Sequence, residues 1–140
     1  MNETMITLVG RVTGEVTHRR YGDDKDLVRF RLFTKERRYD PDQRTWVNAN
    51  PMYFTVNCWD TLGAAVSRTL RSGARVVVHG KLSLRQYDNG DKQRFDAKVD
   101  ARSIGADLVF QQVAIEHEEW TGPAEPLTQL DRPAPAALAA

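Results

Sequence analysis

The fold is decided by the stretch from Pro51 to Gly73, PMYFTVNCWDTLGAAVSRTLRSG. Its first part alternates with the two-residue period of a β-strand, and Phe54, Val56 and Cys58 form the apolar face. The opposite face places two aromatic rings around two small polar residues: Tyr53, Thr55, Asn57 and Trp59. A solvent-facing strand usually carries charges there, so we expect these rings either to be covered or to stack on a partner.

The second part of this stretch predicts a helix. Asp60 is the expected N-cap, because its side chain can accept a hydrogen bond from the first helical turn. Residues at helical spacing then form one stripe: Leu62, Ala65, Val66, Thr69 and Leu70. Ser72-Gly73 is expected to end the helix, since glycine readily adopts a left-handed C-terminal cap.

Alternation predicts four further strands, over residues 5–16, 27–34, 75–87 and 92–103. Their expected core side chains include Val28, Phe30, Leu32, Val76, Val78, Leu82, Leu84, Phe95, Ala97, Val99 and Ala101. Asn89-Gly90 predicts a type I′ hairpin between the last two strands. Five strands with one helix between the third and fourth describe an all-β OB-fold, a five-stranded Greek-key barrel. Such barrels bind oligonucleotides on strands two and three and the flanking loops.

The segment 35–50, KERRYDPDQRTWVNAN, mixes cations with aromatic rings in a loop or a long hairpin. Such a mixture suits a nucleic-acid strand, because cations neutralise phosphates and rings stack on bases. A solvated loop with its rings packed against the body explains the same composition equally well. Arg29 and Arg31 share the outer face of the second strand, where solubility alone accounts for two charges.

Length and charge limit the classes of function that this sequence can have. The 140 residues suit one domain, which we place at 1–110. The segment 111–120 is a candidate extra strand or clamp, for which the apolar residues 108–115 could form a short strand, and 121–140 is expected to be a disordered Pro/Ala-rich tail. Residues 1–105 carry 19 Lys/Arg against 13 Asp/Glu, which favours an anionic partner. The start, MNETMITLVG, lacks the features of a signal peptide, and a single cysteine excludes an internal disulfide, so we expect a cytoplasmic protein.

Catalytic chemistry is not apparent in the sequence. The three histidines, His18, His79 and His117, are isolated, and no Cys/His spacing is typical of a metal site. No phosphate-binding glycine loop or nucleophile motif is present either. We therefore predict no enzymatic activity, no metal and no cofactor.

Residues 4–110 resemble the bacterial single-stranded DNA-binding proteins. The resemblance rests on ITLVGRV, VRFRLFT and FTVNCWDTLGAAVSRTLRSGARVVVHGKL, and YDPDQRTW is similar to the corresponding loop of actinobacterial members. It implies sequence-independent binding of single-stranded DNA in replication, recombination or repair, in the cytoplasm with the nucleoid. It also implies a homotetramer that forms through the first strand and its neighbours.

The resemblance also implies individual site residues. The family's base-stacking positions fall on Tyr39, Tyr53, Trp59 and Tyr87, and its phosphate-contacting positions on Arg19, Arg71 and Arg85, with Lys81, Arg29 and Arg31 nearby. Other cation positions of the family hold Thr55, Thr61 and Ser72 here, which predicts fewer phosphate contacts. In some actinobacterial members a strand after the barrel hooks onto a neighbouring subunit, and residues 108–115 match that place.

The C-terminus departs from the family pattern. Typical members end in a Gly-rich linker and an acidic tip that recruits other enzymes, whereas this sequence ends LDRPAPAALAA. It resembles a tail-poor paralogue, and we do not expect recruitment through a tip. Two alternatives stay open: a protein that co-assembles with another subunit or docks a replication partner while binding DNA weakly, and an RNA-binding OB domain.

Overall fold

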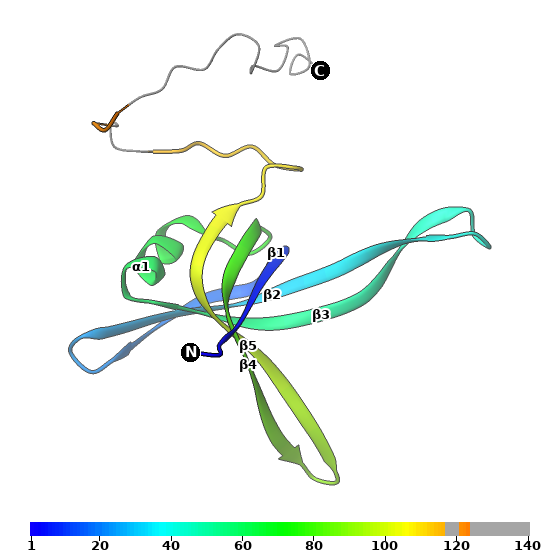
Figure 1. The fold of residues 1–140 in the computed structure, drawn as a ribbon, viewed down its shortest axis with the longest axis horizontal. Helices are drawn as coiled ribbons and strands as arrows, with labels where there is room; N and C mark the ends of the chain where they lie inside the picture. Colours follow the sequence, from blue (N-terminus) through cyan, green and yellow to red (C-terminus); the bar gives the residue numbers. More distant parts are fainter. Residues whose placement is uncertain (117–120, 124–140) are drawn as a thin grey trace.

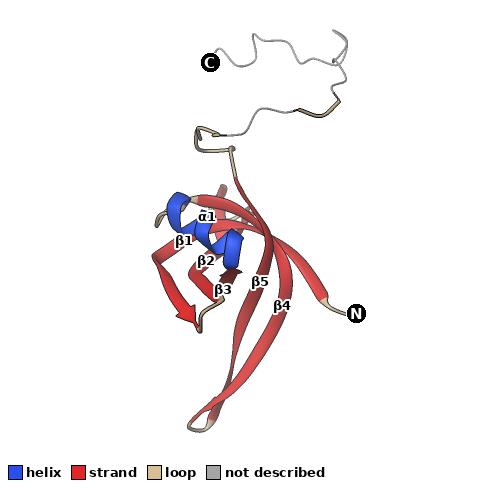
Figure 2. Ribbon diagram, turned by 90° about the vertical axis from the view of Figure 1, so that its left-hand side faces the viewer, coloured by secondary structure: helices blue, strands red, loops and turns tan. Residues whose placement is uncertain are grey.

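The computed structural model describes residues 1–116 and 121–123, and it contains five strands and one helix in the expected order. The elements are β1 (Thr4–Tyr21), β2 (Lys25–Asp40), β3 (Thr45–Trp59), α1 (Asp60–Thr69), β4 (Arg75–Asn89) and β5 (Lys92–Ala106). The strands close a barrel in the order β1-β2-β3-β5-β4, with β3 and β5 parallel and the other pairs antiparallel. Figure 2 shows α1 lying across one end of the barrel. This is the predicted OB-fold.

Alternating apolar side chains from the strands and α1 fill the barrel. The buried core consists of Val12, Val28, Phe30, Leu32, Phe54, Val56, Cys58, Val66, Leu70, Val76, Val78 and Val99. Cys58 is fully buried, and burial raises the pKa of its thiol to about 12. The thiol therefore stays protonated and packs as a small apolar side chain, as the sequence predicted.

Besides the β1–β2 hairpin, which also projects from the barrel, two hairpins extend beyond it and are here called arms (Figure 1). One arm is the outer part of β2 and β3, which close at the turn 41–44, so segment 35–50 is a long hairpin. The other is the outer part of β4 and β5. Leu84 and Phe95 lie on this second arm and are 61% and 63% exposed, so their predicted core positions were wrong. The alternation of apolar and polar residues continues along the arm, but no other part of the described chain packs over its apolar side.

The ends of α1 differ from the prediction. The Asp60 side chain caps no helical N–H group; its Oδ1 atom accepts a hydrogen bond from the Asp26 backbone N–H at 3.3 Å. At the other end Leu70 is the C-cap, and its N–H donates to the Val66 carbonyl at 2.9 Å. Gly73, with φ of 96°, belongs to the turn into β4, where its N–H donates to the Val12 carbonyl. Local capping rules would assign the Asp60 side chain and the Gly73 N–H group to the ends of the helix. Both instead form hydrogen bonds with other elements, Asp60 with β2 and Gly73 with β1.

The β4–β5 hairpin forms at the predicted place with a different turn. Asn89 pairs with Lys92, so Gly90 and Asp91 are the two loop residues. Only Gly90 has a positive φ, 70°, which fits a type II′ turn, because that turn needs glycine at its first central position.

The segment after β5 forms no strand between residues 107 and 116 of this single chain. Its addition to a neighbouring subunit stays a prediction. The predicted tail lies outside the described residues except for 121–123. Within the described part of the chain, no helix has the length and apolar character needed to cross a membrane.

Candidate nucleic-acid interface

The outward side chains of β2 and β3 form one continuous surface, here called the β2–β3 outer face. It contains Arg29, Arg31 and Phe33 from β2 and Tyr53, Thr55, Asn57 and Trp59 from β3. The strand register sets Phe33 opposite Tyr53, Arg31 opposite Thr55 and Arg29 opposite Asn57. Trp59 and Tyr53 are six residues apart along β3, so the face is about 20 Å long, at roughly 3.4 Å per residue.

The two rings at the ends of this face are uncovered. Tyr53 is 54% exposed and Trp59 is 38% exposed. Each is supported by one neighbouring ring: Phe33 lies 5.0 Å from Tyr53, and Tyr21 lies 5.9 Å from Trp59, between ring centroids. The sequence left open whether another part of the chain covers the rings. Both remain open to solvent, where a flat partner can stack on them.

The middle of the face is cationic. Thr55 and Asn57 are buried because the two arginines of β2 extend across them. Arg29 Nε donates to Asn57 Oδ1 at 2.9 Å, and Arg31 Nη1 donates to Thr55 Oγ1 at 2.6 Å. The Arg31 guanidinium carbon also lies 5.7 Å from the centre of the Tyr53 ring. The guanidinium groups are thus held between the two exposed rings.

Strand β5 adds acidic groups that the sequence analysis did not assign to the site. It runs parallel to β3 and places Lys98 opposite Thr55 and Asp100 opposite Asn57. Asp100 Oδ1 accepts hydrogen bonds from Asn57 Nδ2 at 3.4 Å and from the Trp59 indole nitrogen at 3.5 Å. Asp96 lies 3.4 Å from Arg31 Nη1. These carboxylates orient Trp59 and Arg31, and they reduce the positive charge of the face.

Tyr87 and Arg85 extend the site onto β4. An open pocket of about 510 Å³ is lined by Arg31, Arg85, Tyr87 and Asp96, so the β2–β3 outer face continues onto the β4–β5 arm. Lys81 lies farther along β4, opposite Asp100 in the β4–β5 ladder. The structure therefore brings two predicted phosphate-contacting residues, Arg31 and Arg85, into one pocket with the predicted stacking residue Tyr87.

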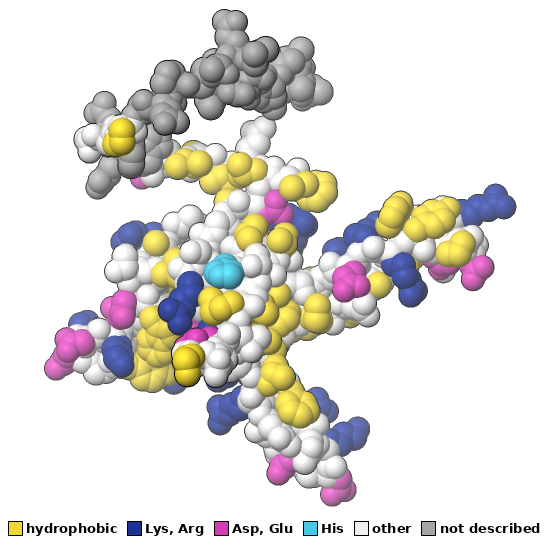
Figure 3. Space-filling view, in the orientation of Figure 1, with side chains coloured by type: hydrophobic (Ala, Val, Ile, Leu, Met, Phe, Trp, Pro, Cys, Tyr) yellow, Lys and Arg dark blue, Asp and Glu magenta, His cyan; other side chains and the backbone are white. Residues whose placement is uncertain are grey.

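Tyr39 lies apart from the other predicted stacking residues, near the tip of the β2–β3 arm. It packs edge-on against Trp46, with ring centroids 5.7 Å apart and planes at 68°. Both rings are exposed, so they pack on each other and not on the body of the protein. Figure 3 shows hydrophobic side chains among Lys and Arg groups along this arm.

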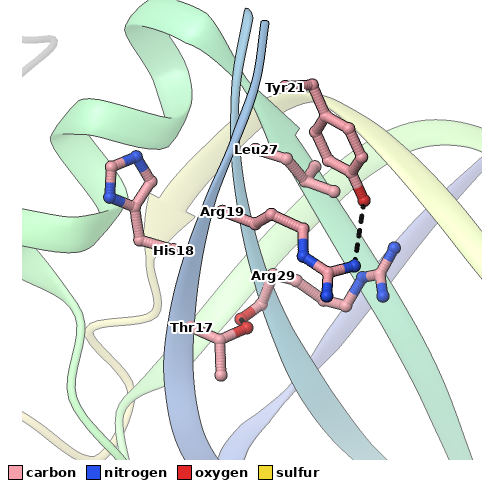
Figure 4. Close-up of a pocket in the computed structure, with 6 residues that line it drawn as sticks. All are labelled: Thr17, His18, Arg19, Tyr21, Leu27 and Arg29. Carbon is pink, nitrogen blue, oxygen red and sulfur yellow. Dashed lines mark hydrogen bonds between the residues drawn. The ribbon is translucent and has the colours of Figure 1, made fainter.

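Arg71 and Arg19 occupy two different places. Arg71 lies just after α1, and its Nη1 donates to the carbonyls of Ser67 at 3.2 Å and Leu70 at 3.0 Å, so the group completes the helix C-terminus. Arg19 lines an open pocket of about 310 Å³ beside Trp59, together with Tyr21 and Arg29 (Figure 4). The hydrogen bond from Arg19 is the main cause that lowers the pKa of Tyr21.

Metal-binding groups are not found in this site. Over residues 1–116 and 121–123, no three His, Cys, Asp or Glu side chains are grouped so that they could hold a metal ion. His18 lies 3.3 Å from Asp26, and His79 Nδ1 lies 2.8 Å from the Thr7 hydroxyl. His117 lies outside the described residues.

A closed five-stranded barrel with exposed rings and guanidinium groups on β2 and β3 defines an oligonucleotide-binding type of OB-fold protein. Residues 1–107 match the model of the single-strand binding protein family, and the chain belongs to that family. The resemblance that the sequence motifs indicated is thereby confirmed.

Individual relatives agree with this assignment. The chain is 34% identical to Single-stranded DNA-binding protein 1 of Streptomyces coelicolor over 135 residues, which cover 96% of this chain and 84% of that protein. The crystal structure of the small single-stranded DNA-binding protein from Streptomyces coelicolor matches with a TM-score of 0.70 at 35% identity, covering 77% of this chain and 97% of that chain. The second single-stranded DNA-binding protein of Mycobacterium smegmatis matches with a TM-score of 0.65 at 32% identity, covering 82% and 99%.

Proposed function

We propose that this protein binds single-stranded DNA without sequence preference and protects it during replication, recombination or repair, in the cytoplasm with the nucleoid. The observation that carries the proposal is the β2–β3 outer face, where two exposed rings flank two guanidinium groups. Every base offers a flat face for stacking, and every nucleotide carries a phosphate, so such a face holds a strand of any sequence.

The predicted residues take different shares in this function. Trp59 and Tyr53 stack bases on the barrel, with Arg29 and Arg31 between them, and Tyr87 with Arg85 and Lys81 continues the path onto β4. Tyr39 contacts a strand that extends along the β2–β3 arm. Arg71 contributes less than the other cations, because its guanidinium group already donates to two carbonyls of α1.

A titration with poly(dT) at several salt concentrations tests the function. We expect quenching of tryptophan fluorescence on binding, as a base stacks on Trp59, and an affinity that falls with salt. Deep quenching together with a shallow salt slope, that is, a logarithm of affinity that falls only slowly with the logarithm of salt concentration, would indicate few phosphate contacts. Strong salt dependence without quenching would place the DNA on cationic groups away from Trp59 on the face and from Trp46 on the β2–β3 arm. Absence of binding would refute the proposal, and poly(U) as competitor would detect an RNA preference.

Single substitutions test the face itself. Trp59→Ala and Tyr53→Ala should each weaken binding of a labelled oligo(dT), measured by fluorescence anisotropy, by about 1–3 kcal/mol, the usual contribution of one stacked base. Phe95→Ala is the matched control. Phe95 is an exposed ring on the β4–β5 arm, and it contacts none of the aromatic rings that pair with each other in the described part of the chain. Equal affinities for all three variants would refute stacking on this face.

We also propose a homotetramer that assembles through β1. Met5 and Val9 are exposed on the outer surface of β1, and the apolar segment 108–115 leaves the barrel beyond β5. Native mass spectrometry of the purified chain should give four copies. A monomer that assembles only with another subunit would favour the interaction-protein alternative.

A further inference from the structure

We propose that the pocket at the base of the β1–β2 hairpin is an additional nucleotide subsite, with a base stacked on Tyr21 and a phosphate held between Arg19 and Arg29. This proposal rests on the proposed function and extends the DNA path from β3 across β2 onto β1. It adds Tyr21 to the stacking residues and gives Arg19 and Arg29 one shared phosphate.

The strand register places these residues on one surface. Arg19 of β1 lies opposite Leu27 of β2, and Leu27 lies opposite Trp59 of β3, so the three form a row across the sheet. Arg29 stands in the next row, opposite Thr17. Leu27 is buried and forms an apolar floor, whereas Arg19 and Trp59 rise on either side of it. A strand leaving Trp59 therefore meets this pocket next.

The charges of the pocket are not balanced within the protein. Arg19 and Arg29 line the same open volume of about 310 Å³, and neither forms an ion pair with any carboxylate of the described residues. The pKa of Tyr21 is lowered first by the hydrogen bond from Arg19 and further by the charges of Arg19, Arg29 and Lys98, which indicates a positive potential around its hydroxyl group. Two like charges in one pocket repel each other, and a bound phosphate relieves that repulsion.

The side-chain directions fit one anion and one base. Figure 4 shows the heads of Arg19 and Arg29 near the Tyr21 hydroxyl; His18 also lines the pocket, but its ring is directed to the other side of β1 from these two heads. Arg19 Nη1 donates to the Tyr21 hydroxyl at 3.5 Å, and Arg29 Nε donates to Asn57, so both guanidinium groups are held in place with further N–H groups unused by these bonds.

The geometry of the rings determines how bases stack. The Tyr21 and Trp59 centroids are 5.9 Å apart with planes tilted by 46°. A base inserted between two parallel rings needs about 6.8 Å, twice the roughly 3.4 Å stacking distance, so no base fits between these two. Tyr21 is 41% exposed and Trp59 is 38% exposed, so each offers an outer face. Two bases of the strand therefore stack separately, one on each ring.

The adjacent arginines of β1 provide a matched pair of variants. Arg19→Gln removes a pocket cation, whereas Arg20→Gln removes the same charge from a side chain that lies 3.9 Å from Asp26 and donates to the Asp23 carbonyl. With oligo(dT), Arg19→Gln should weaken binding about five- to tenfold and make the log–log salt slope shallower by about 0.7, the loss of one phosphate contact on a single strand. Arg20→Gln should stay within about twofold of wild type with an unchanged slope.

Tyr21→Leu separates stacking from charge. It should weaken binding at least about fivefold, as the loss of one stacked base does, while the salt slope stays that of wild type. A loss that appears only as a changed salt slope would overturn the stacking role of Tyr21.

Photocrosslinking of the wild-type protein keeps the proposal testable if a variant fails to fold. An oligonucleotide carrying 5-iododeoxyuridine should crosslink to the tryptic segment Tyr21–Lys25, as well as to the segment that contains Trp59. If wild type binds DNA but Arg19→Gln equals Arg20→Gln and residues 21–25 carry no crosslink, the subsite is refuted and the proposed function stands. If wild type binds no DNA, both proposals fail.

Discussion

At the scale of single residues, Arg31 shows how the protein sets the strength of its own interface. Its Nη1 atom bonds to the Thr55 hydroxyl at 2.6 Å and lies 3.4 Å from the Asp96 carboxylate. Both partners of the ion pair are partly exposed, and such pairs contribute little to stability. A DNA phosphate can therefore replace Asp96 beside Arg31 at low cost. Binding then exchanges one anion for another, which makes the net gain small.

This exchange predicts that Asp96→Asn strengthens DNA binding. The amide oxygen can still accept the Arg31 hydrogen bond, but the competing negative charge is gone. We expect affinity for oligo(dT) to rise about two- to fivefold at low salt, with a salt slope steeper by up to about 0.7, measured by anisotropy titrations. Asp91→Asn, at the hairpin tip, removes the same charge far from Arg31 and should change little. Equal gains for both variants would show a general charge effect only.

At the scale of elements, the closure of the barrel depends on a close approach between β4 and β5. Gly80 of β4 lies at a register shift, opposite Ala101 of β5. A Cβ atom at Gly80 would collide with the Asp100 carbonyl oxygen and would lie 2.9 Å from the Ala101 Cα atom. Both are backbone atoms, so a side chain here would have to move the strand that carries Asp96 and Asp100.

Gly80→Ala should therefore destabilise the protein by about 1–3 kcal/mol, the usual cost of overpacking, as measured by urea unfolding. Gly105→Ala is the control on β5, because a Cβ atom there meets nothing within 4 Å. It should be neutral or stabilising by up to about 1 kcal/mol through the unfolded state. A Gly80→Ala variant as stable as Gly105→Ala would mean that the strands separate there without strain.

The elements also show what the sequence could predict. Alternation predicted all five strands and the buried face of Phe54, Val56 and Cys58, because burial on one side leaves a local pattern. The parallel contact of β3 with β5 leaves no such pattern, since it joins residues more than forty positions apart. Asp96 and Asp100 were therefore missed as members of the site. Tyr21 lies outside the strands predicted over residues 5–16 and 27–34, and only the register of three strands places it beside Trp59.

At the scale of the whole molecule, a small barrel carries two long arms that bear part of the predicted site. The barrel face of about 20 Å matches about six nucleotides stacked at roughly 3.4 Å. Tyr39 and Trp46 lie on the β2–β3 arm, well beyond that face, together with Arg38 and Arg44 (Figure 1). A strand longer than the barrel face can therefore reach the arm, whereas a short one cannot occupy both.

This arrangement predicts a length-dependent effect of shortening the β2–β3 arm. Replacing residues 38–47 with Asn-Gly keeps the paired Arg37 and Asn48 next to a two-residue turn, so the hairpin can close without its tip. The barrel core contains none of the removed residues, so the thermal midpoint should change by only a few degrees. Affinity for an oligo(dT) of about six nucleotides should stay at the wild-type value, whereas affinity for one several times longer should fall at least about tenfold.

A second variant identifies which groups of the arm are responsible. Tyr39→Ala combined with Trp46→Ala keeps the arm and its four cations, Arg37, Arg38, Arg44 and Lys35, but removes the ring pair. If stacking on the arm dominates, this double variant should lose most of the affinity for the long oligonucleotide that the shortened arm loses, and the salt dependence of its affinity should be unchanged. If phosphate contacts dominate, the double variant should keep its affinity, whereas the affinity of the variant with the shortened arm should depend less on salt. An equal loss on short and long oligonucleotides would contradict the separation of arm and barrel, because it would mean that the arm acts on the β2–β3 outer face itself.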